Sequence, residues 1–79
     1  MNRTKAQDFL IQNVISQIAA YIAEDMDTTA EKALEIFFST EISKKIEDIE
    51  TEYYLEGPSY IYEILKEELP FFRRKLPNR

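Results

Sequence analysis

The residues best suited to chemistry in this chain are its carboxylates, because it contains neither cysteine nor histidine. Without those two residue types the chain lacks the usual ligands of zinc, haem, iron–sulfur and copper sites. It also lacks the histidine base and the thiol on which most nucleophilic catalysis depends. A single glycine cannot form a glycine-rich phosphate loop. What remains is acid–base chemistry by carboxylates, or a cation site built from oxygen ligands alone.

A calcium loop is the most specific of these possibilities, and it would begin at Asp25. Asp25, Asp27 and Thr29 occupy positions one, three and five of an EF-hand-like frame. However, Ala30 stands where that loop needs glycine, and Ile36 stands where it needs a bidentate glutamate. We therefore expect the two aspartates to form a helix end and its cap, and we expect no metal and no cofactor.

Closely spaced carboxylates occur at residues 47–48, 50–52 and 67–68. Acid–base catalysis needs a carboxyl whose pKa is shifted by burial or by a close partner. These acids fall on the polar faces of the predicted helices, where water solvates them. We therefore predict that the chain is not an enzyme.

Charge is distributed unevenly along the chain, whose net charge is −5. Residues 24–68 contain fourteen acids and only four lysines, which favours a basic protein partner. The second and third predicted helices could superficially form a helix-turn-helix. The third carries five acids, however, so DNA phosphates would repel it and nucleic-acid binding by the bundle is not expected.

The C-terminal residues have the opposite charge. Residues 70–79 form a basic aromatic tail in which Phe71 and Phe72 precede the candidate anion-contact residues Arg73, Arg74, Lys75 and Arg79. Aromatic and cationic residues together are typical of segments that bind nucleic acid or membrane surfaces. The tail therefore supplies the alternative function, nucleic-acid or anionic-surface binding. The other interpretation is that the phenylalanines fold back on the bundle and the basic end stays solvated.

Four helices must position these residues, at approximately 4–26, 29–38, 41–55 and 59–69. The first begins with a capping box from Thr4 to Gln7, and its apolar residues recur at spacings of three and four. A second capping box is predicted from Thr28 to Glu31, and Thr40 is the predicted cap of the third helix. Together they predict an all-α class, a compact bundle of about four helices forming a single domain over residues 1–69.

One turn separates the last two predicted helices. Gly57 suits a left-handed position after the third helix, Pro58 cannot continue it, and Ser59 is the predicted cap of the fourth. Scarce glycine and proline elsewhere favour a few long helices over a β-rich fold.

Four tyrosines flank this turn, and we expect their rings to gather at one end of the bundle. Tyrosine is enriched at protein interfaces because it combines a large contact area with a polar group. Together with two phenylalanines of the second helix they form the candidate interaction surface: Phe37, Phe38, Tyr53, Tyr54, Tyr60 and Tyr62. The alternative is that the rings form the edge of the core, with hydroxyls reaching water.

A chain of 79 residues buries a modest core, and small domains usually need a further stabilising element. Disulfides and the common metals are excluded by composition, so we expect a homodimer. No apolar run approaches the roughly 20 residues needed to span a bilayer. Polar residues interrupt any signal-peptide core near the N-terminus, and we predict a cytoplasmic protein.

The order of these segments resembles a known family. Asp8-Phe-Leu-Ile opens the first helix, Leu34-Glu-Ile-Phe37 ends the second, and Tyr53-Tyr-Leu-Glu-Gly57 precedes Tyr60-Ile-Tyr-Glu-Ile64. Over residues 8–69 the chain is similar to a family of small all-helical bacterial domains of unknown function, number 3791. That family often has a histidine shortly before the glycine, and this chain does not.

The resemblance implies a gene placed beside genes for ADP-ribosyltransferase-like proteins. That setting would suit an antitoxin-like or accessory partner of another bacterial protein. Taken with the aromatic and acidic surface, it leads us to expect a small protein-interaction module.

Overall fold

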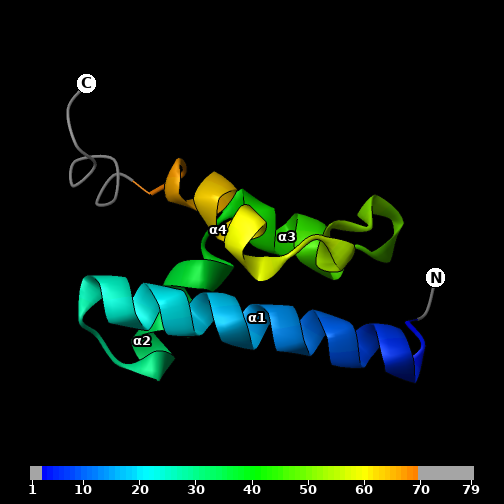
Figure 1. Ribbon diagram of the computed structural model, residues 1–79, viewed down its shortest axis with the longest axis horizontal. Coiled ribbons are helices and arrows are strands. Elements are labelled where there is room, and N and C mark those ends of the chain that lie inside the picture. Colours follow the sequence, from blue (N-terminus) through cyan, green and yellow to red (C-terminus); the bar gives the residue numbers. More distant parts are fainter. Residues whose placement is uncertain (1–2, 70–79) are drawn as a thin grey trace.

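The computed structural model describes residues 3–69, and every regular element in that range is helical (Figure 1). The four α-helices are α1 (Lys5–Met26), α2 (Ala30–Phe38), α3 (Glu41–Glu47) and α4 (Pro58–Lys66). Two short 3-10 turns, η1 (Ile49–Thr51) and η2 (Tyr53–Leu55), lie between α3 and α4. The predicted all-α bundle of about four helices is confirmed. The predicted tail, residues 70–79 with its four cationic residues, lies outside the described range.

The long helix α1 organises the fold. Its N-terminus has the predicted capping box, in which Thr4 accepts from the Gln7 amide and the Gln7 side chain accepts from the Thr4 amide. The helix is capped at its C-terminus by Asp27, which adopts a left-handed conformation (φ 54°). The acidic stretch was predicted to form such a helix end. The inner face of α1 is made of buried residues spaced by three and four: Ile11, Val14, Ile15, Ile18, Ala19 and Ile22.

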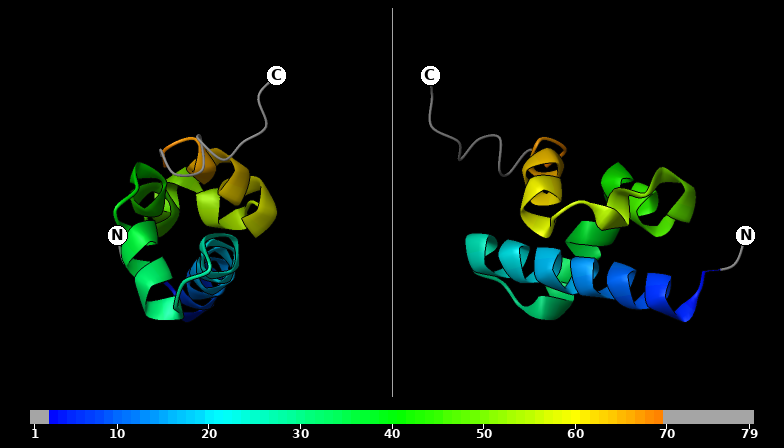
Figure 2. Two further views of the ribbon diagram at one scale, coloured as in Figure 1. Left: turned by 90° about the vertical axis from the view of Figure 1, so that its left-hand side faces the viewer. Right: turned by 45° about the vertical axis from the view of Figure 1, so that its right-hand side comes forward.

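The other elements cover two sides of α1 (Figure 2). Viewed along its length, α1 has α2 on one side, while α3 and α4 lie over another. Phe37 of α2 is fully buried between them, together with Ile42 and Ile46 of α3 and Ile61 and Leu65 of α4. The remaining side of α1 faces away from every described element, so its residues contribute nothing to this core.

The predicted third helix, 41–55, is correct only for its first half. The α-helix ends at Glu47 because Asp48 adopts an extended conformation and its carboxylate accepts a hydrogen bond from the Glu50 amide at 3.0 Å. The Thr51 hydroxyl then bonds back to the carbonyl of Lys45. Glu52 follows in a left-handed conformation (φ 59°). Local polar bonds to the backbone therefore replace helix continuation.

Two predicted caps also differ from the structure. Thr29, not Thr28, caps α2 by accepting from the Lys32 amide at 3.1 Å, so the cap lies one residue later than predicted and the predicted capping box from Thr28 to Glu31 is wrong. Gly57 is the N-cap of α4 in an extended conformation (φ −67°), and Pro58 occupies the first turn, where its missing N–H has no helical partner to lose. The left-handed position predicted for Gly57 and the cap predicted for Ser59 are therefore wrong. The cap predicted at Thr40 is confirmed.

Candidate interaction surfaces

Five large hydrophobic side chains of residues 3–69 are exposed: Phe9, Leu10, Phe38, Leu55 and Tyr60. Phe38 and Tyr60 belong to the predicted interaction surface, whereas Phe9, Leu10 and Leu55 were not predicted. The signal for Phe9 is present in the sequence, because a 3.6-residue period places it opposite the isoleucines of α1. Its side chain is 70% exposed, the largest fraction among the five.

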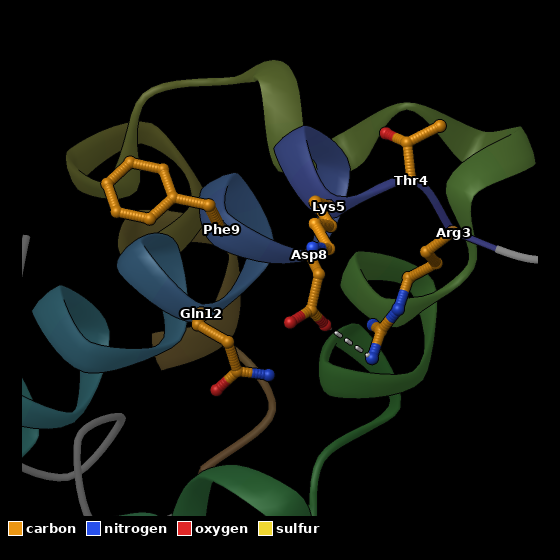
Figure 3. Close-up of a pocket in the computed structure, with 6 residues that line it drawn as sticks. All are labelled: Arg3, Thr4, Lys5, Asp8, Phe9 and Gln12. Atoms are coloured by element: carbon orange, nitrogen blue, oxygen red, sulfur yellow. Dashed lines mark ion pairs between the residues drawn. The ribbon is translucent and has the colours of Figure 1, made fainter.

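The uncovered side of α1 forms a surface that we call the outer face: Ala6, Phe9, Asn13, Ser16 and Ala20, all exposed. At its N-terminal end a shallow depression is lined by the residues drawn in Figure 3. Arg3 and Asp8 form an ion pair there, with 3.0 Å between Nη2 and Oδ1. Lys5 and Phe9 also line it, so a cationic and an aromatic side chain both border this end of the helix.

Half of the predicted aromatic surface is buried. Phe37 is fully buried, and Tyr54 and Tyr62 are 7% and 6% exposed. Tyr53 is partly buried, with the Lys45 ammonium 5.8 Å from its ring centre. For Phe37, Tyr54 and Tyr62 the structure favours the core alternative, and Phe38 and Tyr60 are the accessible members.

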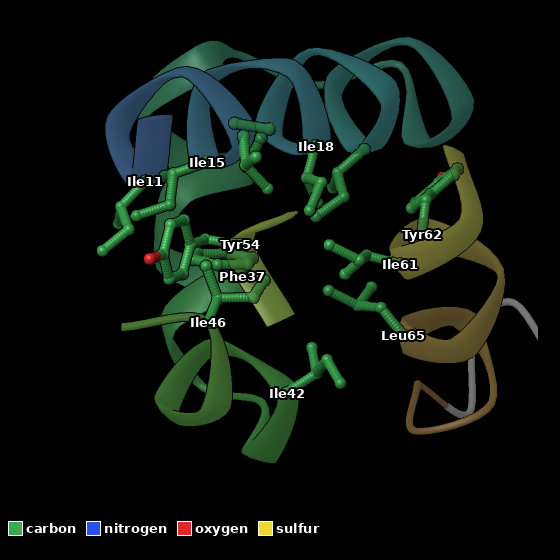
Figure 4. Close-up of a cluster of buried hydrophobic side chains, with 14 residues drawn as sticks. Ile11, Ile15, Ile18, Phe37, Ile42, Ile46, Tyr54, Ile61, Tyr62 and Leu65 are labelled. Atoms are coloured by element: carbon green, nitrogen blue, oxygen red, sulfur yellow. The ribbon is translucent and has the colours of Figure 1, made fainter. Parts of the chain in front are cut away.

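The tyrosines do not gather at one end of the bundle, contrary to prediction (Figure 4). The Tyr54 hydroxyl accepts from Gln7 Nε2 at 3.1 Å, at the N-terminal end of α1. The Tyr62 hydroxyl donates to Asp25 Oδ2 at 2.6 Å, at the C-terminal end. Eighteen residues of helix separate these two contacts, about 27 Å. The prediction failed because the chain from Tyr54 to Tyr62 runs along α1 instead of turning at one place.

A second depression, of about 150 Å³, lies where α4 meets the end of α1. Its walls carry two tyrosines and three acids: Tyr21, Tyr62, Glu24, Asp25 and Glu63, with Ser59 beside them. The two rings are 5.2 Å apart between centroids, and the Tyr21 and Ser59 hydroxyls are 3.3 Å apart. Lys66 lies 5.1 Å from the Tyr62 ring centre and pairs with Glu63. This depression is acidic and aromatic, and its chemistry suits a cationic group.

Electrostatics at this junction favour a neutral tyrosine. Burial raises the pKa of Tyr62 well above its usual range, and the hydrogen bond to Asp25 raises it further because that bond needs the phenol proton. The negative charges of Asp25 and Glu63 act in the same direction. Tyr62 therefore acts as a hydrogen-bond donor that joins α4 to α1, and not as a base.

A carboxylate joins α4 to α3 in a similar way. Glu68 follows α4, and its two oxygens accept from the amides of Glu41 and Ile42 at 2.7 and 2.9 Å. These are first-turn amides of α3, which have no partner within the helix. The sequence predicted that Glu67 and Glu68 are both solvated. That prediction is incomplete, because Glu68 has a structural role.

Within residues 3–69 no group of three or more acidic side chains is arranged to hold a metal ion. None of the helices described there is both long enough and apolar enough to cross a membrane.

No protein-family model matches this chain, and the searches of curated proteins and of solved structures return no significant match either.

Proposed function

We propose that this chain is a small protein-interaction module without catalytic activity. The observation that carries the proposal is the set of five large hydrophobic side chains that remain exposed although the core is closed. Three of them are aromatic (Phe9, Phe38 and Tyr60), and aromatic residues are the type most enriched at protein interfaces. The partner is a second copy of the chain, another protein, or both.

Charge supports a basic partner. Residues 3–69 contain all fifteen acidic side chains of the chain and six of its ten basic ones. Complementary charge speeds the encounter of two proteins and orients them, without itself supplying most of the affinity. The acidic aromatic depression between Tyr21 and Tyr62 offers one place where a lysine or arginine of such a partner would fit.

The family resemblance extends the proposal to a biological setting. It would make the partner a bacterial protein, such as the product of a neighbouring gene, and this chain its antitoxin-like or accessory protein. A cytoplasmic location would follow from such a role.

Site-specific photo-crosslinking tests the proposal. A photoreactive phenylalanine analogue replaces Phe38, Leu55 or Tyr60 in the full chain, and the cells that make the protein are irradiated. We expect a defined adduct from at least one of these positions, identified by mass spectrometry and then reconstituted from purified components. Calorimetry should show a dissociation constant that rises with salt if the partner is basic.

The matched control places the same analogue at Glu31, an exposed acidic position of α2. A partner that recognises the apolar side chains should give much less adduct there. Equal adducts at all four positions, or none at the three apolar ones, would contradict the proposal.

A further inference from the structure

Phe38, the last residue of α2, leaves about half of its side chain without cover within residues 3–69. It is 49% exposed, whereas its neighbour Phe37 is fully buried. The two rings meet edge to face, with 5.0 Å between their centroids. A segment that covered the exposed half of Phe38 would bury a large apolar area.

Two acids share the exposed face of α2 with Phe38. Glu35 lies three residues before Phe38 and Glu31 lies seven residues before it, so the helical period places all three side chains on one side. Glu35 pairs with Lys32 at 3.6 Å in an exposed and therefore weak contact, and Glu31 makes no ion pair within residues 3–69. We call Phe38, Glu35 and Glu31 the α2 strip, an aromatic ring followed by two carboxylates.

The described part of the chain ends close to Phe38. Glu68 binds the amides of Glu41 and Ile42 at 2.7 and 2.9 Å, and Glu41 follows Phe38 by only three residues. The Cα atoms of Phe38 and Glu41 are therefore no more than about 11 Å apart. Residues 70–79 continue the chain from this corner, and an extended segment of that length spans up to about 33 Å. They are long enough to reach the whole α2 strip.

We propose that the basic aromatic tail, residues 70–79, binds the α2 strip of the same molecule and runs antiparallel to α2. In its sequence two phenylalanines come first, and three cationic residues follow at positions 73–75. The strip has the same order when it is followed away from the corner, with the ring first and the carboxylates after it. This contact goes beyond the proposed interaction function and does not depend on it.

The spacing of the two segments fits as well as their order. Phe38 and Glu31 are seven residues apart on a helix, which is about 10.5 Å. From Phe72 to Lys75 an extended backbone advances by three residues, which is about 10 Å. With Phe72 against Phe38, Lys75 therefore lies level with Glu31, and the two arginines between them lie level with Glu35. The opposite direction would place carboxylates beside the phenylalanines and cations beside the ring.

Charge and connectivity both favour a contact within one chain. Residues 3–69 carry fifteen acids and six basic residues, whereas residues 70–79 carry four basic residues and no acid. A short tether keeps the tail at an effective concentration in the millimolar range, so a contact too weak to form between two molecules is still populated. A partner that uses Phe38 would have to displace the tail, and the tail would then control access to that part of the candidate interaction surface.

A spin label tests where the tail binds. The chain has no cysteine, so Asn78→Cys gives a single attachment site for a nitroxide in the full chain. In the ¹⁵N-labelled protein the amide signals of residues 29–35 should lose most of their intensity, because the label lies beside the start of α2. Signals of residues 5–8 should keep theirs, because α1 is about 33 Å long and α2 begins just after its other end. Full intensity in α2, or equal losses in both regions, would overturn the contact.

A mixed sample separates a contact within one molecule from a contact between two. Spin-labelled protein without ¹⁵N is combined with ¹⁵N-labelled protein that has no spin label. An intramolecular contact should cause no loss of signal in this mixture. A loss at residues 29–35 equal to that in the doubly labelled chain would assign the α2 strip to the tail of a second copy and overturn the proposal.

Charge reversal tests the register. Lys75→Glu should weaken the contact about two- to fivefold and return part of the α2 intensity, because an attractive pair becomes repulsive. Adding Glu31→Lys should restore the original loss, with an unchanged circular dichroism spectrum. Glu47→Lys is the matched control, since it makes the same charge change at an exposed position in α3, and adding it should restore nothing. Equal recovery with both additions, or none with Glu31→Lys, would overturn the register.

These outcomes are separate from those that test the proposed function. Photo-crosslinks from Leu55 and Tyr60 to another protein would support an interaction module whether or not the tail binds α2. A bound tail without any such adduct would remove the proposed function and leave this contact standing.

Discussion

α1 and the segment from Glu41 to Gly57 are held in the fold by different kinds of interaction. The inner face of α1 contributes a row of six aliphatic side chains, each 5% exposed or less, and its polar bonds lie only at its ends. The segment 41–57 contributes few buried side chains and is shaped by single polar atoms of Thr40, Asp48, Thr51 and Glu68. Regular periodicity therefore specifies one region, and individual hydrogen bonds specify the other.

The difference predicts which substitutions affect stability most. Removing a buried aliphatic side chain should destabilise the domain more than removing any one polar contact, because the apolar loss includes a cavity. Removing a residue of the outer face should have almost no effect on the monomer. The four predictions below run from the largest expected effect to the smallest.

Ile18→Ala should have the largest effect. Ile18 is fully buried in the middle of α1, so we expect a loss of about 3–4 kcal/mol in the free energy of unfolding, measured by urea denaturation. Small domains have a total stability near the low end of about 5–15 kcal/mol, so the variant should be close to unfolded at room temperature. Ile18→Val, with an expected loss of about 1 kcal/mol, keeps the effect measurable. If Ile18→Ala lowered the free energy of unfolding by less than about 1 kcal/mol, α1 would not be held mainly by packing.

Tyr62→Phe should cost about 1.5 kcal/mol at neutral pH, because it removes the donor of a 2.6 Å hydrogen bond and leaves Asp25 without that partner. The difference from wild type should depend on pH. The folded-state pKa of Tyr62 is raised above its ordinary value of 10.0, so its stabilising contribution is complete below pH 10 and is lost as the pH rises further. The loss is at most about 1.4 kcal/mol per pH unit.

Denaturation of both proteins between neutral pH and alkaline pH measures this dependence. Other tyrosines and the lysines titrate in both proteins, so the comparison with the variant isolates Tyr62. A difference that stays constant above pH 10 would contradict the assigned role of the phenol proton.

Glu68→Ala should cost about 1 kcal/mol, the usual value of a helix N-cap, because it leaves two amides of α3 without their acceptor. Glu67→Ala is the control. Glu67 is exposed and its side chain makes no hydrogen bond or ion pair within residues 3–69, so we expect a change within about 0.5 kcal/mol. Equal effects of the two substitutions, measured by thermal or urea unfolding, would mean that Glu68 does not anchor α3.

Ser16→Ala should have the smallest effect on the monomer. Ser16 lies on the outer face of α1 and is exposed, so the free energy of unfolding should change by less than about 0.5 kcal/mol, with a slight gain from helix propensity. The measurement is made at a concentration where the chain is monomeric. A large loss of unfolding free energy there would show that this face takes part in the fold.

The same contrast explains how much of the fold the sequence predicts. The isoleucine spacing and the Thr4 capping box predict α1 to within one residue, because many side chains repeat the same signal. The third predicted helix ran eight residues too far, since the bonds made by Asp48 and Thr51 depend on local geometry that apolar spacing does not report. The surface was predicted only in part, because Tyr54 and Tyr62 pack into the core and their hydroxyls bond to Gln7 and Asp25, far away in the sequence.

The contact between Glu68 and α3 connects residues 26 and 27 positions apart in the chain, and it has a consequence for motion. The amides of Glu41 and Ile42 are protected by an acceptor that belongs to the end of α4, not to their own helix. When that end frays, the two amides lose their acceptor while the rest of α3 keeps its helical bonds. In hydrogen–deuterium exchange they would therefore exchange at the rate at which the chain beyond Lys66 opens. The first turn of α3 is in this sense a reporter of how tightly the C-terminal end of the bundle is closed.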